Sequence, residues 1–163
     1  MSRSQIEIVL QPGEYHFGDR HTRIRTLLGS CVAITLWHPR LLIGGMCHFL
    51  LPNRGTGTAL QGDGRYGDEA MALLLEAVAA HGTRPQEYEA KLFGGGDMFG
   101  GRLTHAAFNI GARNVEAAHR LLHRHGMGTK ASCVGRRGYR NVFLDIATGH
   151  VWVRHVADAA CAA

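Results

Sequence analysis

The sequence predicts an α+β or mixed α/β domain, because many short apolar runs resemble strands and only two stretches carry a helical pattern. Its 163 residues are enough for one domain with a core of ordinary size. A hydrophobic fraction of 45% and a charged fraction of 19% are typical of folded soluble proteins. We therefore expect a single domain over residues 1–157 and a mobile tail of small residues over 158–163.

Four strands are expected before the first helix. The first two are short, and the second ends at Gly29. The third is apolar and β-branched and stops at His38–Pro39, and the fourth is interrupted by Gly44–Gly45. The short connection around His38–Pro39 predicts that the third and fourth strands form a hairpin. In chain order these strands are Gln5–Leu10, Arg23–Leu28, Cys31–Trp37 and Leu41–Leu51.

Two helices are expected in the second part of the chain. Residues 52–67 are rich in glycine and lack periodicity, which predicts a loop. Asp68–His81 then carries one apolar face, with Asp68 as its N-cap and Gly82 after its end. Asn114–His125 carries a second apolar face and is followed by a glycine. The remaining strands are expected at Glu89–Phe93, Lys130–Val134, Arg140–Asp145 and His150–Val156, and Ala147-Thr148-Gly149 makes the last two a hairpin.

Composition and charge exclude several classes of protein. No apolar run approaches the roughly 20 residues that span a bilayer, and the N-terminus lacks the apolar core of a signal peptide. We therefore expect a cytoplasmic protein without membrane insertion. The net charge is +5, and basic residues collect between residues 113 and 140. Because interleaved aromatic residues are missing there, we expect a solvated face and no nucleic-acid site, while an acidic protein partner stays open.

The cysteines are expected to be free thiols. Their spacing shows no C-x-x-C pair, so neither a zinc knuckle nor a redox dithiol is indicated. Two histidines, His119 and His123, lie four positions apart on the second helix, but no third ligand is evident. No metal and no organic cofactor is therefore expected. The cysteines are Cys31, Cys47, Cys133 and Cys161.

One cysteine and one histidine stand out because they occupy neighbouring predicted strands. Cys31 follows Gly29-Ser30, where a sharp turn frees backbone N–H groups to face a developing oxyanion. His48 lies in the partner strand, and a nearby imidazole can take the proton of a thiol or stabilise its thiolate. The pattern predicts Cys31 as a nucleophile, His48 as its base, and Ser30 and Gly29 as oxyanion or pocket residues.

Strand alternation distinguishes the two cysteines of this region. His48 shares a face with Met46, whereas Cys47 points to the opposite face. Cys47 is therefore expected to be a small buried apolar residue. On spacing alone, simpler alternatives remain for the other two side chains, because a strand cysteine such as Cys31 often only packs, and a strand histidine is often a hydrogen-bonded core residue.

Several motifs, in the same order along the chain, resemble the CheD family of chemoreceptor glutamine deamidases. The resemblance extends over roughly residues 5–156. The stretches that carry it are Leu28-Gly29-Ser30-Cys31-Val32, Gly44 to Pro52, Arg65-Tyr66 with Asp68, Lys91 to Phe99, Asn109 to Asn114, and Thr148-Gly149.

The resemblance implies a protein-glutamine glutaminase. Members of the family hydrolyse particular glutamine side chains to glutamate on the cytoplasmic domains of methyl-accepting chemotaxis receptors. The family's nucleophile corresponds to Cys31 and its histidine to His48. A threonine completes the family's catalytic set, and Thr26 is the candidate here, orienting His48 by accepting its ring N–H. An ordinary β-branched strand residue is the alternative for Thr26.

The resemblance also implies a fold and partners. The fold would consist of layered β-sheets flanked by helices, similar to the deamidase domain of a bacterial cytotoxic necrotizing factor. The thiol mechanism that the resemblance implies needs no metal and no organic cofactor. Many members bind a CheC-type phosphatase, so the alternative function is a non-catalytic binding module that regulates such a phosphatase.

Overall fold

The computed structural model describes residues 4–55, 57–98 and 109–156. The predicted tail at 158–163 lies outside the described residues. The elements of the described chain are, in order, β1 (Ile6–Leu10), β2 (Tyr15–Gly18), β3 (Thr22–Leu28), β4 (Val32–His38), β5 (Ile43–Phe49), α1 (Gly67–Ala80), η1 (Pro85–Glu87), β6 (Glu89–Gly94), α2 (Ile110–Arg124), β7 (Thr129–Val134), β8 (Tyr139–Asp145) and β9 (Val151–Val156).

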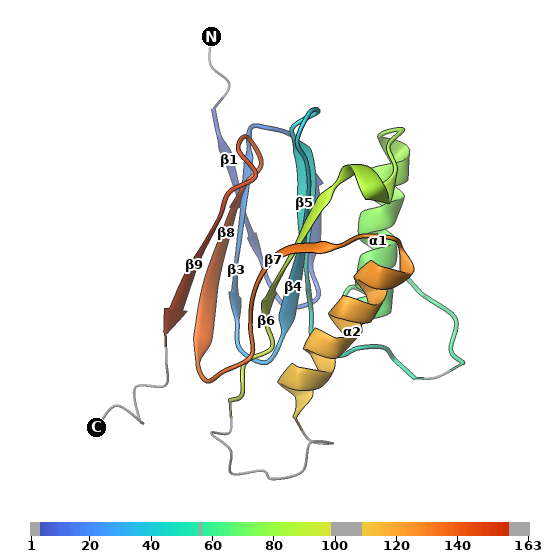
Figure 1. Ribbon diagram of the computed structural model, residues 1–163, viewed down its shortest axis with the longest axis vertical. Helices are drawn as coiled ribbons and strands as arrows, with labels where there is room; N and C mark the ends of the chain where they lie inside the picture. Colours follow the sequence, from blue (N-terminus) through green and yellow to red (C-terminus); the bar gives the residue numbers. More distant parts are fainter. Residues whose placement is uncertain (1–3, 56, 99–108, 157–163) are drawn as a thin grey trace.

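The strands form two mixed sheets that stack face to face, and both helices lie on the outer side of one of them (Figure 1). The four-stranded sheet has the order β1-β3-β8-β9, and the five-stranded sheet has the order β2-β5-β4-β6-β7. Each sheet contains one parallel pair, β1 with β3 and β6 with β7. The α+β prediction with layered sheets and flanking helices is confirmed, and the five-stranded sheet is the middle layer.

Burial on both faces explains why the middle layer contains the most apolar strands. Every residue of β4 from Val32 to Leu36 is buried, because one face packs on the helices and the other on the second sheet. Cys47 and Leu74 belong to the helix-side core, whereas Met46 and Ile24 belong to the core between the sheets. The predicted alternation along the strand that carries His48 is therefore confirmed.

The N-terminal strands differ from the prediction in three places. β4 begins at Val32, so Cys31, predicted as the first residue of this strand, lies in the turn before it. β5 continues through Gly44–Gly45, so the predicted interruption is wrong, and the strand is shorter than Leu41–Leu51. The glycines serve close approach: a Cβ on Gly45 would collide with the carbonyl oxygen of His16 in β2. β2 was not predicted, because it is a short edge strand of mixed composition that pairs only with β5.

Helix α1 begins one residue earlier than predicted, and its predicted cap is wrong. The N-cap position is Tyr66, so Asp68 lies inside the first turn. There its carboxylate accepts the N–H of the adjacent Glu69 at 2.8 Å. Negative charge in this turn still favours the helix, because the exposed N–H groups give that end a partial positive charge.

Helix α2 begins four residues before the predicted start. Asn109 caps it by accepting the N–H of Ala112 at 3.0 Å. The first turn contains Gly111, a poor helix former, and a side chain there would collide with the carbonyl oxygen of Gly95. The glycine therefore lets the start of α2 approach the chain that follows β6, which brings the helix to the same end of the molecule as the β3–β4 turn (Figure 1).

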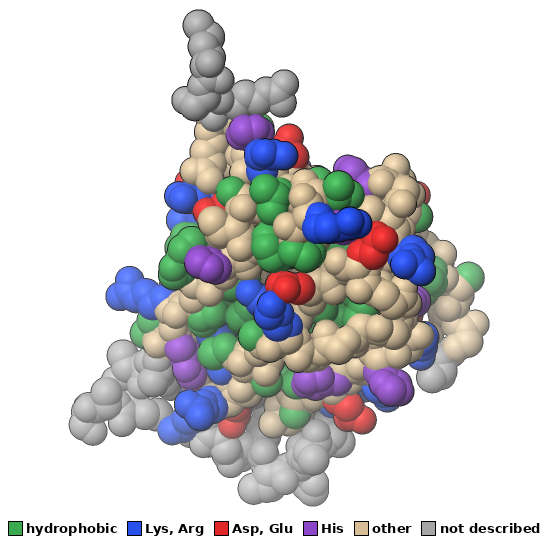
Figure 2. Space-filling view, turned by 45° about the horizontal axis from the view of Figure 1, so that its top comes forward, with side chains coloured by type: hydrophobic (Ala, Val, Ile, Leu, Met, Phe, Trp, Pro, Cys, Tyr) green, Lys and Arg blue, Asp and Glu red, His purple; other side chains and the backbone are tan. Residues whose placement is uncertain are grey.

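Most of the basic residues between 113 and 140 are exposed, as predicted for a solvated face, but Arg140 is buried at 1% exposure, so that part of the prediction is wrong. On the side that Figure 2 shows, Lys and Arg side chains lie scattered among acidic, histidine and hydrophobic ones and form no continuous basic patch. None of the helices in the described part of the chain is long and apolar enough to cross a membrane.

Candidate active site

The two sheets bring His48 and Thr26 together. β4 and β5 are antiparallel neighbours, as predicted, and Ala33 lies directly opposite His48. The imidazole reaches the facing sheet, where its Nδ1 lies 2.6 Å from Oγ1 of Thr26 in β3. Both side chains are buried, His48 to 1% and Thr26 to 3% exposure. The predicted contact of Thr26 with the ring is therefore present, and it joins the two sheets.

The hydrogen bonds of Thr26 determine the tautomer of His48. Oγ1 of Thr26 also lies 2.9 Å from the carbonyl oxygen of Leu10, which can only accept a hydrogen bond. The hydroxyl proton therefore goes to Leu10, and the threonine oxygen accepts the proton on Nδ1 of His48. This assignment leaves a lone pair on Nε2 of the ring.

That lone pair belongs to a neutral base. Burial lowers the pKa of His48 from 6.5 to about 4, since little water reaches the ring to solvate an imidazolium. Nε2 is buried, and no described atom hydrogen-bonds to it. A buried ring nitrogen without a partner is an exception in folded proteins, and in a site it marks an acceptor that is ready for a proton.

Cys31 lies where the chain crosses from one sheet to the other. It occupies the turn between β3 and β4, is half-buried, and packs against the core between the sheets, the same side on which His48 lies. Nε2 of His48 has no hydrogen-bond partner among the described residues, so the predicted pair makes no direct hydrogen bond, although both residues border the core between the sheets. Catalytic contacts of this kind often tighten only when substrate binds.

The thiol of Cys31 is also held mainly in its neutral form. Burial raises its pKa, and a hydrogen bond from its own backbone N–H opposes that effect. A neutral thiol and a neutral imidazole therefore describe the resting site better than a thiolate and an imidazolium. The arrangement therefore favours proton transfer during attack over a permanently charged nucleophile.

Three successive carbonyls fix the turn that presents Cys31. The oxygen of Gly29 accepts the N–H of Gly96 at 2.9 Å, and that of Cys31 accepts the N–H of Gly95 at 2.8 Å. The oxygen of Ser30 accepts from Nδ2 of Asn114 at 3.1 Å. With its carbonyls held, the turn has little freedom, and within the described residues the N–H groups of Ser30 and Cys31 donate to no other residue's carbonyl. N–H groups in this position beside a nucleophile suit the stabilisation of an oxyanion, although the N–H of Cys31 also donates to its own sulfur.

Asn114 is a site-forming residue that the sequence reasoning missed. It lies on α2, is fully buried, and donates to the oxygens of both Ser30 and Leu50, at 3.1 and 2.8 Å. It thereby joins the turn before Cys31 to the end of the strand that carries His48. The signal in the sequence was its place at the end of the motif Asn109 to Asn114, one of the stretches that carry the family resemblance, whereas Asn114 itself was expected only to begin a helix.

Replacing Asn114 with aspartate tests this link. The side chain keeps its shape, but a carboxylate cannot donate, so two buried carbonyl oxygens lose their partner. We expect the free energy of unfolding to fall by about 1–3 kcal/mol, as measured by urea denaturation. The exposed Asn53→Asp is the matched control and should leave stability unchanged. Equal stability of both variants would show that Asn114 does not hold the turn.

Cys47 shows what a structural thiol looks like in the same strand. It is fully buried in the helix-side core, on the opposite face of β5 from His48. Burial raises its pKa to about 12, which makes it inert at neutral pH. The prediction that Cys47 is a small buried apolar residue is confirmed.

The site as a whole contains the components of acyl transfer. A thiol on a rigid turn, a neutral base with a fixed tautomer, and free backbone N–H groups are the parts that attack on an amide carbonyl requires. Such an arrangement also needs a third group that orients the base, and the hydroxyl of Thr26 contacts Nδ1 of His48 in the position for that role.

Comparison with known proteins connects this geometry to one family. A family model described as CheD chemotactic sensory transduction matches residues 50–155. A probable chemoreceptor glutamine deamidase CheD from Pseudomonas syringae pv. tomato is 51% identical over 92% of this chain and 89% of that protein. The protein named probable chemoreceptor glutamine deamidase CheD 3 from Dechloromonas aromatica is 50% identical over 90% of this chain and 86% of its own.

A less similar relative matches this chain over the same extent. The protein named probable chemoreceptor glutamine deamidase CheD 2 from Geobacter sulfurreducens is 34% identical over 91% of this chain and 89% of its own length. The family model begins at residue 50, after Thr26, Cys31 and His48, so the similarity to individual relatives extends further than the family match.

Proposed function

Because this chain belongs to the CheD family of chemoreceptor glutamine deamidases, we propose that it performs the family's reaction with Cys31, His48 and Thr26. The chain is an amidohydrolase that deamidates glutamine side chains of chemoreceptors in chemotaxis. The observation that supports the proposed mechanism is the hydrogen bond from Nδ1 of His48 to Oγ1 of Thr26, which leaves Nε2 of a buried neutral imidazole without a partner.

In the first half of the reaction, sulfur replaces nitrogen on the glutamine side chain. Nε2 of His48 takes the thiol proton as the sulfur of Cys31 attacks the amide carbon, and Thr26 continues to accept the Nδ1 proton. The amide oxygen becomes an oxyanion, which the N–H groups of Ser30 and Cys31 stabilise. The imidazolium then returns its proton to the departing nitrogen, ammonia leaves, and a thioester remains.

In the second half, water releases the product. Nε2 of His48, neutral again, takes a proton from a water molecule that attacks the thioester carbon. The same backbone N–H groups stabilise the second oxyanion. The thiol of Cys31 leaves with the proton from His48, and glutamate is formed on the receptor. The proton that leaves the sulfur in the first half departs with ammonia, and the proton that restores the thiol at the end comes from the attacking water.

Mass spectrometry of a receptor signalling fragment tests the function. After incubation with this protein, glutamine-containing peptides should gain the mass of an amide-to-acid conversion, and ammonia should be released in equal amount. The parent protein and the Cys31→Ala variant are compared on the same fragment. No mass gain on any cognate receptor would defeat the proposed function.

The Thr26→Val variant tests the role of the hydroxyl. Valine preserves the shape of the side chain but leaves the Nδ1 proton of His48 without an acceptor, so the ring loses its fixed tautomer. We expect kcat to fall about 10- to 100-fold, the size of effect seen when a group that orients a histidine is lost. Thr26→Ser retains the oxygen and should recover most of the rate. Equal rates for valine and serine would remove Thr26 from the mechanism.

The same resemblance supports four finer proposals. Residues 1–157 act as one deamidase-like domain, and its layered sheets share the fold of the cytotoxic necrotizing factor deamidase domain. The reaction takes place in the cytoplasm, on the cytoplasmic domains of the receptors. A CheC-type phosphatase is a binding partner, and co-purification of the two proteins with and without Cys31→Ala tests whether binding is independent of catalysis.

A further inference from the structure

The chain between β5 and α1 folds back on the strand that carries His48. The N–H groups of Leu50 and Leu51 both donate to the carbonyl oxygen of Arg65, at 2.8 and 3.2 Å. The N–H of Gly67 donates in turn to the oxygen of Leu51 at 2.8 Å. The connection therefore closes immediately after β5, and we call residues 57–66 its returning arm.

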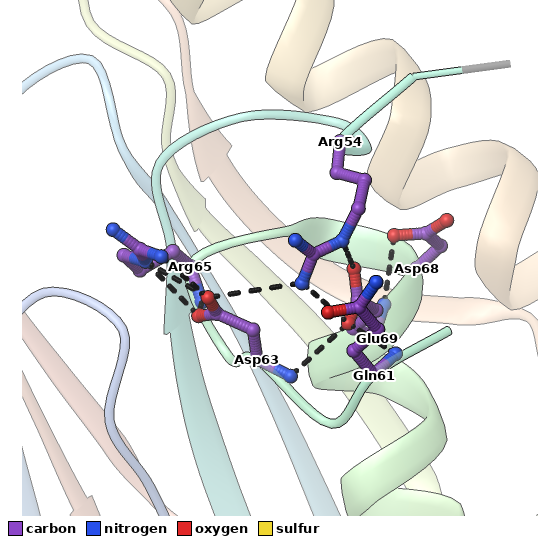
Figure 3. Close-up of polar contacts among 6 residues, drawn as sticks. All are labelled: Arg54, Gln61, Asp63, Arg65, Asp68 and Glu69. Carbon is purple, nitrogen blue, oxygen red and sulfur yellow. Dashed lines mark hydrogen bonds and ion pairs between the residues drawn. The ribbon is translucent and has the colours of Figure 1, made fainter. Parts of the chain in front are cut away.

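A buried carboxylate holds this arm in place (Figure 3). Glu69, in the first turn of α1, is 1% exposed. Its carboxylate accepts from Nε and Nη2 of Arg54 at 3.0 and 3.2 Å. It also accepts the backbone N–H groups of Gln61 and Asp63 at 2.6 and 3.1 Å. One side chain therefore joins the helix, the outgoing chain and the returning arm.

The carboxylate of Glu69 belongs to a network in which acidic and basic side chains alternate. Asp63 lies between two arginines, 2.6 Å from Nη2 of Arg65 and 3.9 Å from Nη2 of Arg54 (Figure 3). Two carboxylates and two guanidinium groups are thus paired, and a third carboxylate, that of Asp68, accepts the N–H of Glu69 next to them. The hydrogen bond from Arg54 is the main cause that lowers the pKa of Glu69 to about 2, so Glu69 is ionised throughout the neutral range.

The returning arm is connected to the backbone of His48. The side chain of Arg65 packs so closely on Gly13 that a Cβ there would lie 2.7 Å from its Cγ. The N–H of Gly13 donates to the oxygen of His48 at 2.8 Å, and the N–H of His48 donates to the oxygen of Glu14 at 3.1 Å. The turn that Arg65 covers therefore bonds both backbone groups of the catalytic histidine.

We propose that Glu69 is a positioning residue for deamidation, which holds the returning arm so that Arg65 and the turn at Gly13 fix the backbone of His48. This inference rests on the proposed role of His48 as the base. His48 lies near the end of β5, which is the second strand from the edge of its sheet. Its backbone needs such support, because displacement of a catalytic group by about 1 Å can lower the rate about 10²-fold.

The Glu69→Gln variant tests the proposal. Glutamine keeps the size of the side chain and one oxygen for the N–H groups of Gln61 and Asp63, but its NH₂ group faces Nε of Arg54, which loses its acceptor. The charge is also lost, so the remaining hydrogen bonds to the returning arm become weaker. We expect kcat to fall about 10- to 100-fold with little change in KM, because the substrate's own contacts are untouched. Amide hydrogen exchange should become faster at Gln61, Asp63 and His48.

Three comparisons make this test specific. Glu76→Gln, at an exposed position of the same helix, should change neither kcat nor exchange. Glu69→Asp keeps the charge and should recover part of kcat. Arg54→Gln removes the guanidinium partner of the same carboxylate and should also lower kcat and speed exchange. It therefore still tests the proposal if Glu69→Gln does not fold.

The outcomes separate this inference from the proposed function. Faster exchange in the arm with the parent kcat would refute the positioning role, and so would unchanged exchange at Gln61 and Asp63. If the parent protein deamidates no receptor, the proposed function fails. In that case the exchange at His48 still decides whether Glu69 holds its backbone.

Discussion

Replacing Cys31 with alanine should abolish deamidation, lowering kcat by about 10⁴- to 10⁶-fold, as when the nucleophile of a hydrolytic triad is removed. The other parts of the site remain, but no sulfur is left to form the thioester. The fold should persist, because Cys31 is half-buried in a turn whose three carbonyls are held by Gly95, Gly96 and Asn114. The measurement is glutamate formation on a receptor fragment, followed by mass spectrometry, with thermal unfolding of the same samples.

Cys47→Ala is the matched control for this experiment. The residue lies in the neighbouring strand, but its side chain belongs to the helix-side core, and its thiol has a pKa of about 12. The variant should keep the parent kcat even where it loses some stability. A Cys31→Ala rate within about tenfold of the parent, a barrier change near 1.4 kcal/mol, would remove Cys31 as the nucleophile.

The pairing of β4 with β5 and the face on which His48 lies could be predicted from the sequence. The short connection at His38–Pro39 indicated a hairpin, and β4 and β5 form that hairpin. The period of two along the second strand placed His48 and Cys47 on opposite faces, because alternation depends only on the extended backbone. Both features depend only on residues that are close together in the sequence, so they can be predicted without the tertiary structure.

The parts that depend on packing between distant segments could not be predicted. Nothing in the sequence indicates that β3 belongs to the sheet facing β5, and this arrangement is what places Thr26 against His48. Asn114 is more than 80 positions from Ser30, so its contact exists only after α2 docks. The pKa of the imidazole likewise depends on the burial that both sheets create together.

Replacing His48 with glutamine should lower kcat by about 10²- to 10⁴-fold, the usual contribution of a positioned proton-transfer group. Glutamine can still fill the space and bond to Thr26, but it offers no basic nitrogen to the thiol of Cys31. The fall in kcat should therefore exceed that of Thr26→Val, in which the imidazole remains but is no longer held in one orientation. A larger effect for Thr26→Val would mean that the hydroxyl acts on the substrate directly.

The pH profile of the parent protein gives the sharper test of His48. The base works only when unprotonated, and burial lowers its pKa to about 4, so kcat/KM should hold as pH falls through 6.5 and decline near pH 4. The free energy of unfolding should fall over the same range as pH drops from 6.5 to 4, because His48 takes up a proton below pH 6.5 in the unfolded chain but only near pH 4 in the folded one. Each unit of pKa difference corresponds to about 1.4 kcal/mol.

Those two effects can be separated, because circular dichroism reports the folded fraction at each pH and the rate is then taken per folded molecule. In His48→Gln the stability loss between pH 6.5 and 4 should shrink, since the group that binds the proton on unfolding is gone. A parent profile that declines near pH 6.5 at full folding would describe a solvated histidine, which cannot be the buried base that the bond from Nδ1 to Thr26 orients.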